Sequence, residues 1–339
     1  MRKSYLVTGG TGFIGSAVVR RLLEEGNRVR VLDNDMRGPS SRLKDVSGRI
    51  DMVRADVRDD KAVRRAVRGV DSVCHLAYLN GTEFFYRRPD LVLDIGVKGM
   101  INVIDSCAKE GVKELVLLSS SEVYQTPSVI PTDENAALSI PDPLNPRYSY
   151  AGGKIISELM AINYGRKYFR KVIVMRPHNV YGPDMGSEHV MPQIIIRMKK
   201  LCRETKERYV KFPIQGSGDQ TRAFIFIEDF MEAFMSVIKK GKHLNIYNIG
   251  TQEEIPIKNV ALAAGVYFGK RVILVPQAPP AGSPLRRCPD ITRIKKLGFK
   301  QRFCFLDGFN VTAKWYDENT DKGPVRTAGK VESGGIYVR

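Results

Sequence analysis

A glycine-rich turn between an apolar strand and an amphipathic helix constrains the fold of this chain more than any other feature. Residues 4–8 read as a short apolar strand with Leu6 and Val7 at its centre. Glycines follow at Gly9, Gly12 and Gly15, and residues 13–25 carry apolar side chains at helical spacing. Gly9 permits the tight turn, Gly12 lets the backbone approach a pyrophosphate, and Gly15 lets helix and strand pack closely. The free N–H groups at the start of the helix favour phosphate oxygens. The motif therefore predicts a dinucleotide-binding unit at the start of a parallel sheet.

Strand and helix patterns alternate through the first half of the chain. Apolar strands are expected at residues 4–8, 28–33, 50–55, 70–77, 114–119 and 171–175. Helices are expected at residues 13–25, 61–67, 91–109 and 150–168. Strands that alternate with helices pair in parallel through right-handed crossovers. The expected fold class is α/β, a Rossmann-like doubly wound parallel sheet with a smaller C-terminal substrate-binding region.

The pattern loosens after residue 175, where Pro, Gly and His become frequent. Two more helices are expected at 192–204 and 228–239, and one more strand at 245–249. These segments can fold over the carboxyl ends of the strands, where open α/β sheets bind ligands. We therefore expect a dinucleotide-binding domain, a mainly substrate-binding region and a flexible tail over residues 1–175, 176–317 and 318–339.

The charge of the chain restricts its partners without identifying one. The 339 residues carry a formal net charge of +17, but the basic side chains are dispersed, and glutamates interrupt the densest stretch at 197–211. The chain has no RNA-module signature, so we expect no specific nucleic-acid partner. No apolar run reaches the roughly 18 residues that a membrane span needs, and the N-terminus lacks a signal-peptide core. We expect a cytoplasmic protein without membrane contact.

Cysteine and histidine usage indicates neither disulfides nor a metal. The chain has five cysteines and four histidines, and no group of them has the spacing of a metal site. Cys74 lies in an apolar run and Cys107 on an expected helix, where both are interpreted as buried apolar residues.

An acidic residue ends the second expected strand. The carboxylate of Asp33 can accept both hydroxyls of an adenosine ribose, and it repels a 2′-phosphate, which favours NAD over NADP. Arg37 complicates this prediction, because an arginine close by could bind the phosphate of NADP. Asp56 and Val57 follow the third strand and are expected beside the adenine.

Further motifs follow the glycine turn in order along the chain. They are Thr8 to Gly15, Asp33, Asp56, His75-Leu76-Ala77, Ser119-Ser120-Ser121 and Tyr150-Ala151-Gly152-Gly153-Lys154. Together they resemble the extended short-chain dehydrogenase/reductases of the NAD-dependent epimerase/dehydratase type, which act on nucleotide sugars, and the resemblance runs to about residue 317. It implies NAD as cofactor and a homodimer formed through the helices that start near Leu91 and Tyr150. The cofactor-binding residues are then expected to be Gly9, Gly12, Phe13, Ile14, Gly15, Asp33, Asn34, Asp56, Val57, Leu76, Ala77, Tyr150 and Lys154.

Tyr150 and Lys154 have the spacing of a catalytic pair. They are four residues apart on an expected helix and therefore share one face. A lysine ammonium and the positive nicotinamide ring favour the phenolate form of a nearby tyrosine, so Tyr150 can act as a general base on a sugar hydroxyl. Ser120 is expected to hydrogen-bond the same hydroxyl. Tyr148 is not a candidate for this role, because Gly152 and not a lysine lies four residues after it.

The resemblance also implies a substrate side. Asn179, in the segment 176–183, corresponds to the asparagine of the family that contacts the substrate pyrophosphate. Arg222 and Arg287 correspond to arginines that pair with a diphosphate, and bidentate guanidinium groups suit that anion. The sequence departs from the family at Gly96, where an asparagine is usual, and at Tyr78, where a small residue is common.

The residues after Ser120 separate the possible reactions. The family's 4,6-dehydratases usually carry Thr-Asp-Glu here, so Ser121 replaces their acid, whereas Glu122 remains, as it does in the family's decarboxylases. Glu122 and His189 lie where a related 3,5-epimerase has its second acid/base pair. We predict an NAD-dependent nucleotide-sugar epimerase that works through a transient keto sugar. The alternatives are a decarboxylase, a 4,6-dehydratase, a net dehydrogenase and, in another class, a non-catalytic NAD-binding scaffold or redox sensor.

Overall fold

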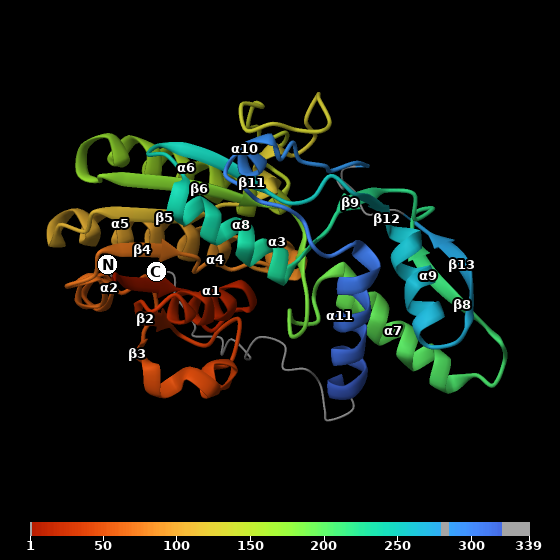
Figure 1. The fold of residues 1–339 in the computed structure, drawn as a ribbon. Helices are drawn as coiled ribbons and strands as arrows, with labels where there is room; N and C mark the ends of the chain where they lie inside the picture. The colour runs from red at the N-terminus through yellow and green to blue at the C-terminus, as the bar shows by residue number, and fades with distance from the viewer. Residues whose placement is uncertain (1, 279–284, 321–339) are drawn as a thin grey trace, which may run out of the picture.

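The computed structural model describes residues 2–278 and 285–320, and its centre is a seven-stranded parallel sheet (Figure 1). The strand order across the sheet is β11-β6-β5-β4-β1-β2-β3, and every neighbouring pair is parallel. The strands are β1 (Ser4–Thr8), β2 (Arg28–Asp33), β3 (Ile50–Arg54), β4 (Ser72–His75), β5 (Glu114–Leu118), β6 (Lys171–Pro177) and β11 (Asn245–Ile249). This arrangement confirms the Rossmann-like α/β class.

Helices cover both faces of the sheet, as Figure 1 shows. α1 (Phe13–Glu24) and α8 (Ile227–Lys240) lie together on one face, and their apolar stripes form a core with Val31 and Ile173. α2 (Asp60–Val67), α5 (Gly99–Glu110) and α6 (Ser149–Tyr168) pack on the other face. A strand that is buried on both sides needs apolar residues at successive positions, and all five residues of β5 are buried.

A second group of elements packs beyond the carboxyl ends of the strands, on the right of Figure 1. It comprises the helices α7 (Val190–Glu204), α9 (Ile257–Tyr267) and α11 (Phe305–Asn319) and the paired strands β8 (Tyr209–Gln215) and β13 (Arg271–Gln277). Their own core includes Ile194, Phe212 and Phe309. Short strand pairs join β7 (Val180–Tyr181) to β10 (Ile225–Phe226) and β9 (Thr221–Ala223) to β12 (Glu254–Pro256).

The remaining helical segments are short. They are η1 (Ser40–Arg49), α3 (Thr82–Arg87), α4 (Pro89–Leu93), η2 (Asp94–Lys98), η3 (Ser121–Tyr124), η4 (Pro146–Tyr148) and α10 (Thr292–Lys296). Helical residues run without a break through the expected range 91–109, and within it α4, the π-helical turn η2 and α5 follow one another. A π turn adds one residue to a helical turn, and apolar periodicity over so short a stretch does not reveal it.

The chain crosses back to the sheet after residue 175. α8 and β11 both follow that position, yet β11 is the edge strand beside β6 and α8 packs against α1.

The division into domains stays a prediction. Of the expected tail, residues 318–319 continue α11, and residues 321–339 lie outside the described part.

Within residues 2–278 and 285–320, no helix is long and apolar enough to cross a bilayer. In the same ranges, no three histidine, cysteine, aspartate or glutamate side chains are grouped so that they could hold a metal ion. The five cysteines are free thiols.

Candidate active site

A cavity of about 360 Å³ opens at the carboxyl ends of β1, β2, β4 and β5 and extends toward α7. Residues from distant parts of the chain line this cavity. Open α/β sheets bind their ligands at the carboxyl ends of the strands, where the cavity lies. The predicted site residues that line it are Gly9, Gly12, Phe13, Ile14, Gly15, Asp33, Asn34, Asp56, Val57, Leu76, Ala77, Ser120, Glu122, Tyr150, Lys154, Asn179, His189 and Arg287. Arg222, on β9, is not part of this lining.

The glycine turn leaves no room for side chains where the chain folds back on itself. Gly9 has a φ of +73°, and its N–H donates to the Leu32 carbonyl at 2.9 Å. A Cβ on Gly15 would lie 2.0 Å from the Gly9 oxygen, so strand and helix can approach this closely only with glycine. A Cβ on Gly12 would meet only the Gly9 oxygen, at 3.2 Å, and Gly12 faces the cavity at the start of α1. The turn therefore has the open side that a pyrophosphate needs.

Asp33 lies at the end of β2, nearly buried at the edge of the cavity. Its carboxylate accepts from the N–H of Thr11 at 3.0 Å and from the N–H of Asp35 at 2.9 Å. Burial raises the pKa of this carboxyl, and the hydrogen bonds from Thr11 and Asp35 oppose the rise. The side chain is thus held beside the glycine turn, where the ribose of a dinucleotide would lie.

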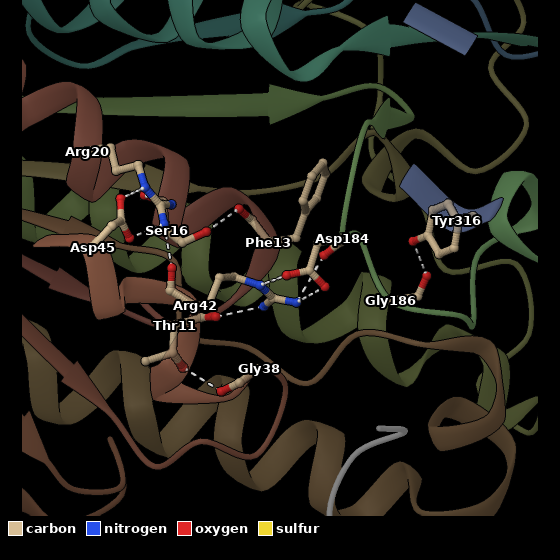
Figure 2. A network of polar contacts seen from close by, with 10 residues as sticks. All are labelled: Thr11, Phe13, Ser16, Arg20, Gly38, Arg42, Asp45, Asp184, Gly186 and Tyr316. Atoms are coloured by element: carbon tan, nitrogen blue, oxygen red, sulfur yellow. Dashed lines mark hydrogen bonds and ion pairs between the residues drawn. The ribbon is translucent and has the colours of Figure 1, made fainter. Parts of the chain in front are cut away.

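Polar contacts connect the region after β2 with the loop that precedes α7. Arg42 donates to both carboxylate oxygens of Asp184, at 2.6 and 2.8 Å, and to the Thr11 carbonyl at 2.7 Å (Figure 2). Arg37 pairs with Glu188 at 2.7 Å. These contacts hold the loop that carries His189 over the cavity. Because Arg37 is paired with Glu188, its guanidinium is already engaged and is less available to the 2′-phosphate of NADP.

Tyr150 lies in the first turn of α6, between two other aromatic rings. The Tyr150 ring stacks on Phe85 with centroids 4.9 Å apart, and it meets Tyr78 edge-on at 5.1 Å. Burial raises the pKa of its phenol well above the usual range, and a hydrogen bond with Ser120 opposes that rise. Tyr150 and Ser120 therefore lie within hydrogen-bonding distance of each other, and their shared role on a sugar hydroxyl stays a prediction.

Lys154 lies one turn further along α6, and its ammonium binds a backbone carbonyl. Its Nζ donates to the Leu118 carbonyl at 2.7 Å and lies 5.8 Å from the centre of the Tyr150 ring. Burial lowers the pKa of Lys154 to about 7, and Glu158 opposes the decrease. Burial dominates the pKa of Tyr150 in this structure. The expected effect of Lys154 together with the nicotinamide ring stays a prediction.

Glu122 faces a group of arginines. Its carboxylate pairs with Arg287 at 2.5 Å and approaches Arg147 to 3.9 Å. Burial raises the pKa of Glu122, but Arg287, Arg147 and Arg222 outweigh it, and the pKa is below its ordinary value. Arg287 is nearly buried, and its Nε and Nη2 have no hydrogen-bond partner among the described residues. Buried N–H groups without a partner can donate hydrogen bonds to the oxygens of a bound anion.

Three further side chains complete the substrate side. Asn179 has a φ of +30°, and its Nδ2 lies 3.4 Å from the Ala223 carbonyl. His189 precedes α7, and burial lowers its pKa to about 4, with Arg37 acting in the same direction, so its imidazole is neutral at pH 7. Burial lowers the pKa of Arg222 to about 10, to which the charge of Arg287 contributes.

Arg147 was not predicted as a site residue, yet it lines the cavity from the short segment η4 before α6. Its position three residues before Tyr150 was a signal that could have identified it, because the start of the catalytic helix faces the cavity. Tyr78 was noticed only as a departure from the family.

The sequence model of the "NAD dependent epimerase/dehydratase family" matches residues 5–250, which is more than half of the chain. The chain belongs to this family. Members of the family are enzymes, and the described cavity contains the residues that the family resemblance assigns to the cofactor.

Similar family members differ in their reactions. A UDP-N-acetyl-alpha-D-glucosaminuronate decarboxylase from Bacillus cytotoxicus is 28% identical over 331 residues, covering 94% of this chain and 99% of that protein. A putative UDP-glucose 4-epimerase from Methanocaldococcus jannaschii is 29% identical over 316 residues, covering 93% and 98%. A trifunctional dehydratase, epimerase and reductase from Arabidopsis thaliana is 28% identical, and the chain spans about half (48%) of its length. These relatives act on nucleotide sugars by different reactions, so they leave the reaction of this chain open.

The structure of a dTDP-glucose 4,6-dehydratase from Streptomyces venezuelae, solved with NAD bound, superimposes with a TM-score of 0.83. It is 28% identical and covers 95% of this chain and 100% of its own. The cofactor of this family member is NAD.

We expect NAD to bind at least about tenfold more tightly than NADP, a difference of about 1.4 kcal/mol. We expect the Asp33 carboxylate, which lines the cavity, to repel a 2′-phosphate, and Arg37 is engaged with Glu188. Calorimetric titration of the cofactor-free protein with each dinucleotide measures the difference. Asp33→Asn removes the charge and keeps an acceptor for the Thr11 N–H, so it should reduce the difference in affinity between NAD and NADP. Equal or tighter binding of NADP would contradict the assignment.

Proposed function

We propose that this family member is an NAD-dependent nucleotide-sugar epimerase that inverts the carbon it oxidises. Tyr150 accepts the proton of the sugar hydroxyl, and Ser120 hydrogen-bonds the same oxygen. When bound, NAD supplies the hydride acceptor and donor and a positive charge that favours the tyrosinate. Tyr150 then returns the proton after the keto sugar has turned its other face to the cofactor. One acid/base group suffices for this cycle.

The ion pair between Glu122 and Arg287 is the observation that carries this choice of reaction. Inversion at a neighbouring carbon needs a second acid/base pair, and elimination of water needs an acid beside Tyr150. Glu122 is held as a carboxylate by Arg287, with Arg147 close by, and Ser121 is a poor acid. A glutamate held in this way is a weak proton carrier at neutral pH, so Tyr150 is left as the acid/base of the site.

The arginines favour a diphosphate as the anchor of the substrate. Arg147 and Arg287 lie beside Glu122, and the charge of Arg222 also acts on that carboxylate. Three guanidinium groups against one carboxylate leave a surplus of positive charge, which the two negative charges of a diphosphate match. The unpartnered Nε and Nη2 of Arg287 provide donors for its oxygens. Asn179 is proposed to contact the same group.

A decarboxylase is the second candidate, and the same part of the cavity favours it. Ser121, Glu122 and Arg287 line the same cavity, and the Arg287 guanidinium could bind the carboxylate of a sugar acid. Oxidation of the hydroxyl two carbons from that carboxylate would give a β-keto acid, which loses carbon dioxide without a further base. The decarboxylase from Bacillus cytotoxicus is similar over nearly the whole chain.

The test screens UDP-, GDP-, CDP- and dTDP-sugars, both neutral hexoses and uronic acids, for thermal stabilisation of the NAD-bound protein. A ligand at 100 times its Kd stabilises the folded state by about 2.7 kcal/mol, so the matching nucleotide should be evident. Each stabilising sugar is then incubated in D₂O, and the product is identified by NMR. We expect an epimer of a neutral sugar whose ring carbons carry no deuterium.

Other products would overturn that expectation in distinguishable ways. A pentose and carbon dioxide from a uronic acid would identify the decarboxylase. Deuterium at a neighbouring ring carbon, lost in Glu122→Gln or His189→Ala, would identify a second acid/base pair. Stabilisation without any turnover would favour a binding scaffold.

The homodimer remains a prediction. Exposed apolar side chains on the helices assigned to the interface are consistent with it, and they include Ile101 on α5 and Ile156 and Leu159 on α6.

A further inference from the structure

Tyr78 occupies a space that two glycines leave open. It follows β4 by three residues and lines the cavity. A Cβ on Gly96, in the π-helical turn η2, would lie 2.3 Å from the Tyr78 hydroxyl oxygen, and a Cβ on Gly153, on α6, would lie 2.1 Å from it. The Tyr78 ring can therefore occupy this place only if positions 96 and 153 carry no side chain. The two departures noticed in the sequence, at positions 78 and 96, are therefore one structural feature.

The Tyr78 ring contacts both members of the catalytic pair. The Lys154 Nζ lies 4.0 Å from the centre of the Tyr78 ring, compared with 5.8 Å from that of Tyr150. The edge-on contact between Tyr78 and Tyr150 spans 5.1 Å between centroids. An ammonium within about 6 Å of a ring face is attracted to it, and the attraction is stronger where water is excluded. Tyr78 is thus the nearest aromatic face to a nearly buried ammonium.

We propose that Tyr78 is a positioning residue of the active site, whose ring, seated against Gly96 and Gly153, holds the Lys154 ammonium and the Tyr150 ring in place. This inference rests on the function proposed above for Tyr150 and Lys154. It assigns the role to the ring and not to the hydroxyl, because the hydroxyl is buried without a hydrogen-bond partner among the described residues.

The first test measures Lys154 directly and needs no substrate. In lysine-labelled, NAD-free protein, the ¹³Cε shift of Lys154 is followed against pH and assigned by its loss in Lys154→Met. The titratable groups that face this ammonium are Tyr78, Tyr150 and Glu158, and His75 from β4. Removing the ring in Tyr78→Leu disfavours the charged form, so the midpoint should fall by about 0.5–1 pH unit. Tyr78→Phe keeps the ring and should leave the midpoint unchanged.

The second test uses turnover of the sugar found in the nucleotide screen. Tyr78→Leu should lower kcat by about tenfold while KM stays within about twofold, because the ring acts on the catalytic pair and not on the substrate. Gly96→Ala, whose Cβ would displace the ring without deleting it, should have the same effect. Tyr78→Phe should retain the wild-type kcat.

The outcomes separate the two proposals. An unchanged Lys154 midpoint in both Tyr78→Leu and Gly96→Ala would overturn the role of Tyr78, whatever the reaction proves to be. Failure of every sugar in the screen would overturn the proposed function, while the titration would still decide on Tyr78. Loss of kcat in Tyr78→Phe would move the role from the ring to the hydroxyl and also contradict the inference.

Discussion

Tyr150→Phe should lower turnover by about 10²–10⁴-fold, which is the usual contribution of a positioned acid/base group. The substitution removes one oxygen atom and keeps the ring, so the contacts of Tyr150 with Phe85 and Tyr78 should persist. NAD binding should change little, because we expect the glycine turn and Asp33, which line the same cavity, to hold most of the nucleotide. The measurements are kcat with the identified sugar and the Kd for NAD.

Tyr148→Phe is the matched control for this prediction. Tyr148 ends η4, two residues before Tyr150, and it is not among the residues that line the cavity. Its substitution should leave turnover near that of the wild-type protein. Near-normal turnover of Tyr150→Phe would show that another group accepts the sugar proton, and loss of NAD binding would show that the phenol holds the cofactor as well.

Much of the fold could be predicted because it depends on local patterns. The strands β1 and β5 are almost entirely buried, and each carries a continuous apolar run, residues 5–7 and 115–118. β11 was also expected as a strand, but its place beside β6 depends on packing between segments about 70 residues apart, which local periodicity does not contain.

The site was predictable where a motif carries its own geometry. The glycine turn and Asp33 lie at one cavity because they end neighbouring parallel strands. The pairing of Glu122 with Arg287 could not be predicted, because it joins residues 165 positions apart. The protonation of Tyr150 could not be predicted either, since it depends on how completely Phe85, Tyr78 and the rest of the cavity remove water from the phenol.

Glu158→Leu should destabilise the fold by about 3–5 kcal/mol, because it leaves the Arg176 guanidinium buried without its counter-charge. Glu158 lies one turn after Lys154 on α6, and Arg176 lies on β6. The two side chains are 3% and 2% exposed. Arg176 donates to both oxygens of Glu158, at 2.9 and 2.6 Å, and Ser119 donates to one of them.

The expected loss of stability corresponds to a fall in Tm of roughly 6–10 °C, since each kcal/mol shifts Tm by about 2 °C in a chain of this size. Differential scanning calorimetry at pH 7 measures it. Glu83→Gln is the matched control: Glu83 pairs with Arg87 on α3 at 2.8 Å, but both side chains are mostly exposed. Exposed pairs of this kind contribute about 0–1 kcal/mol, so Tm should barely change.

The double variant Glu158→Leu/Arg176→Met distinguishes an unpaired buried charge from simple loss of packing. If the charge is the cause, removing it together with its partner should recover most of the lost stability, because buried ion pairs replaced by apolar side chains of similar size are often neutral. If the double variant is as unstable as the sum of the two single variants, the hydrogen bonds to Ser119 and Tyr124 and the packing of α6 on β6 would be responsible instead. A Glu158→Leu protein with unchanged Tm would contradict both accounts, since the guanidinium would then have found water or another acceptor inside the fold.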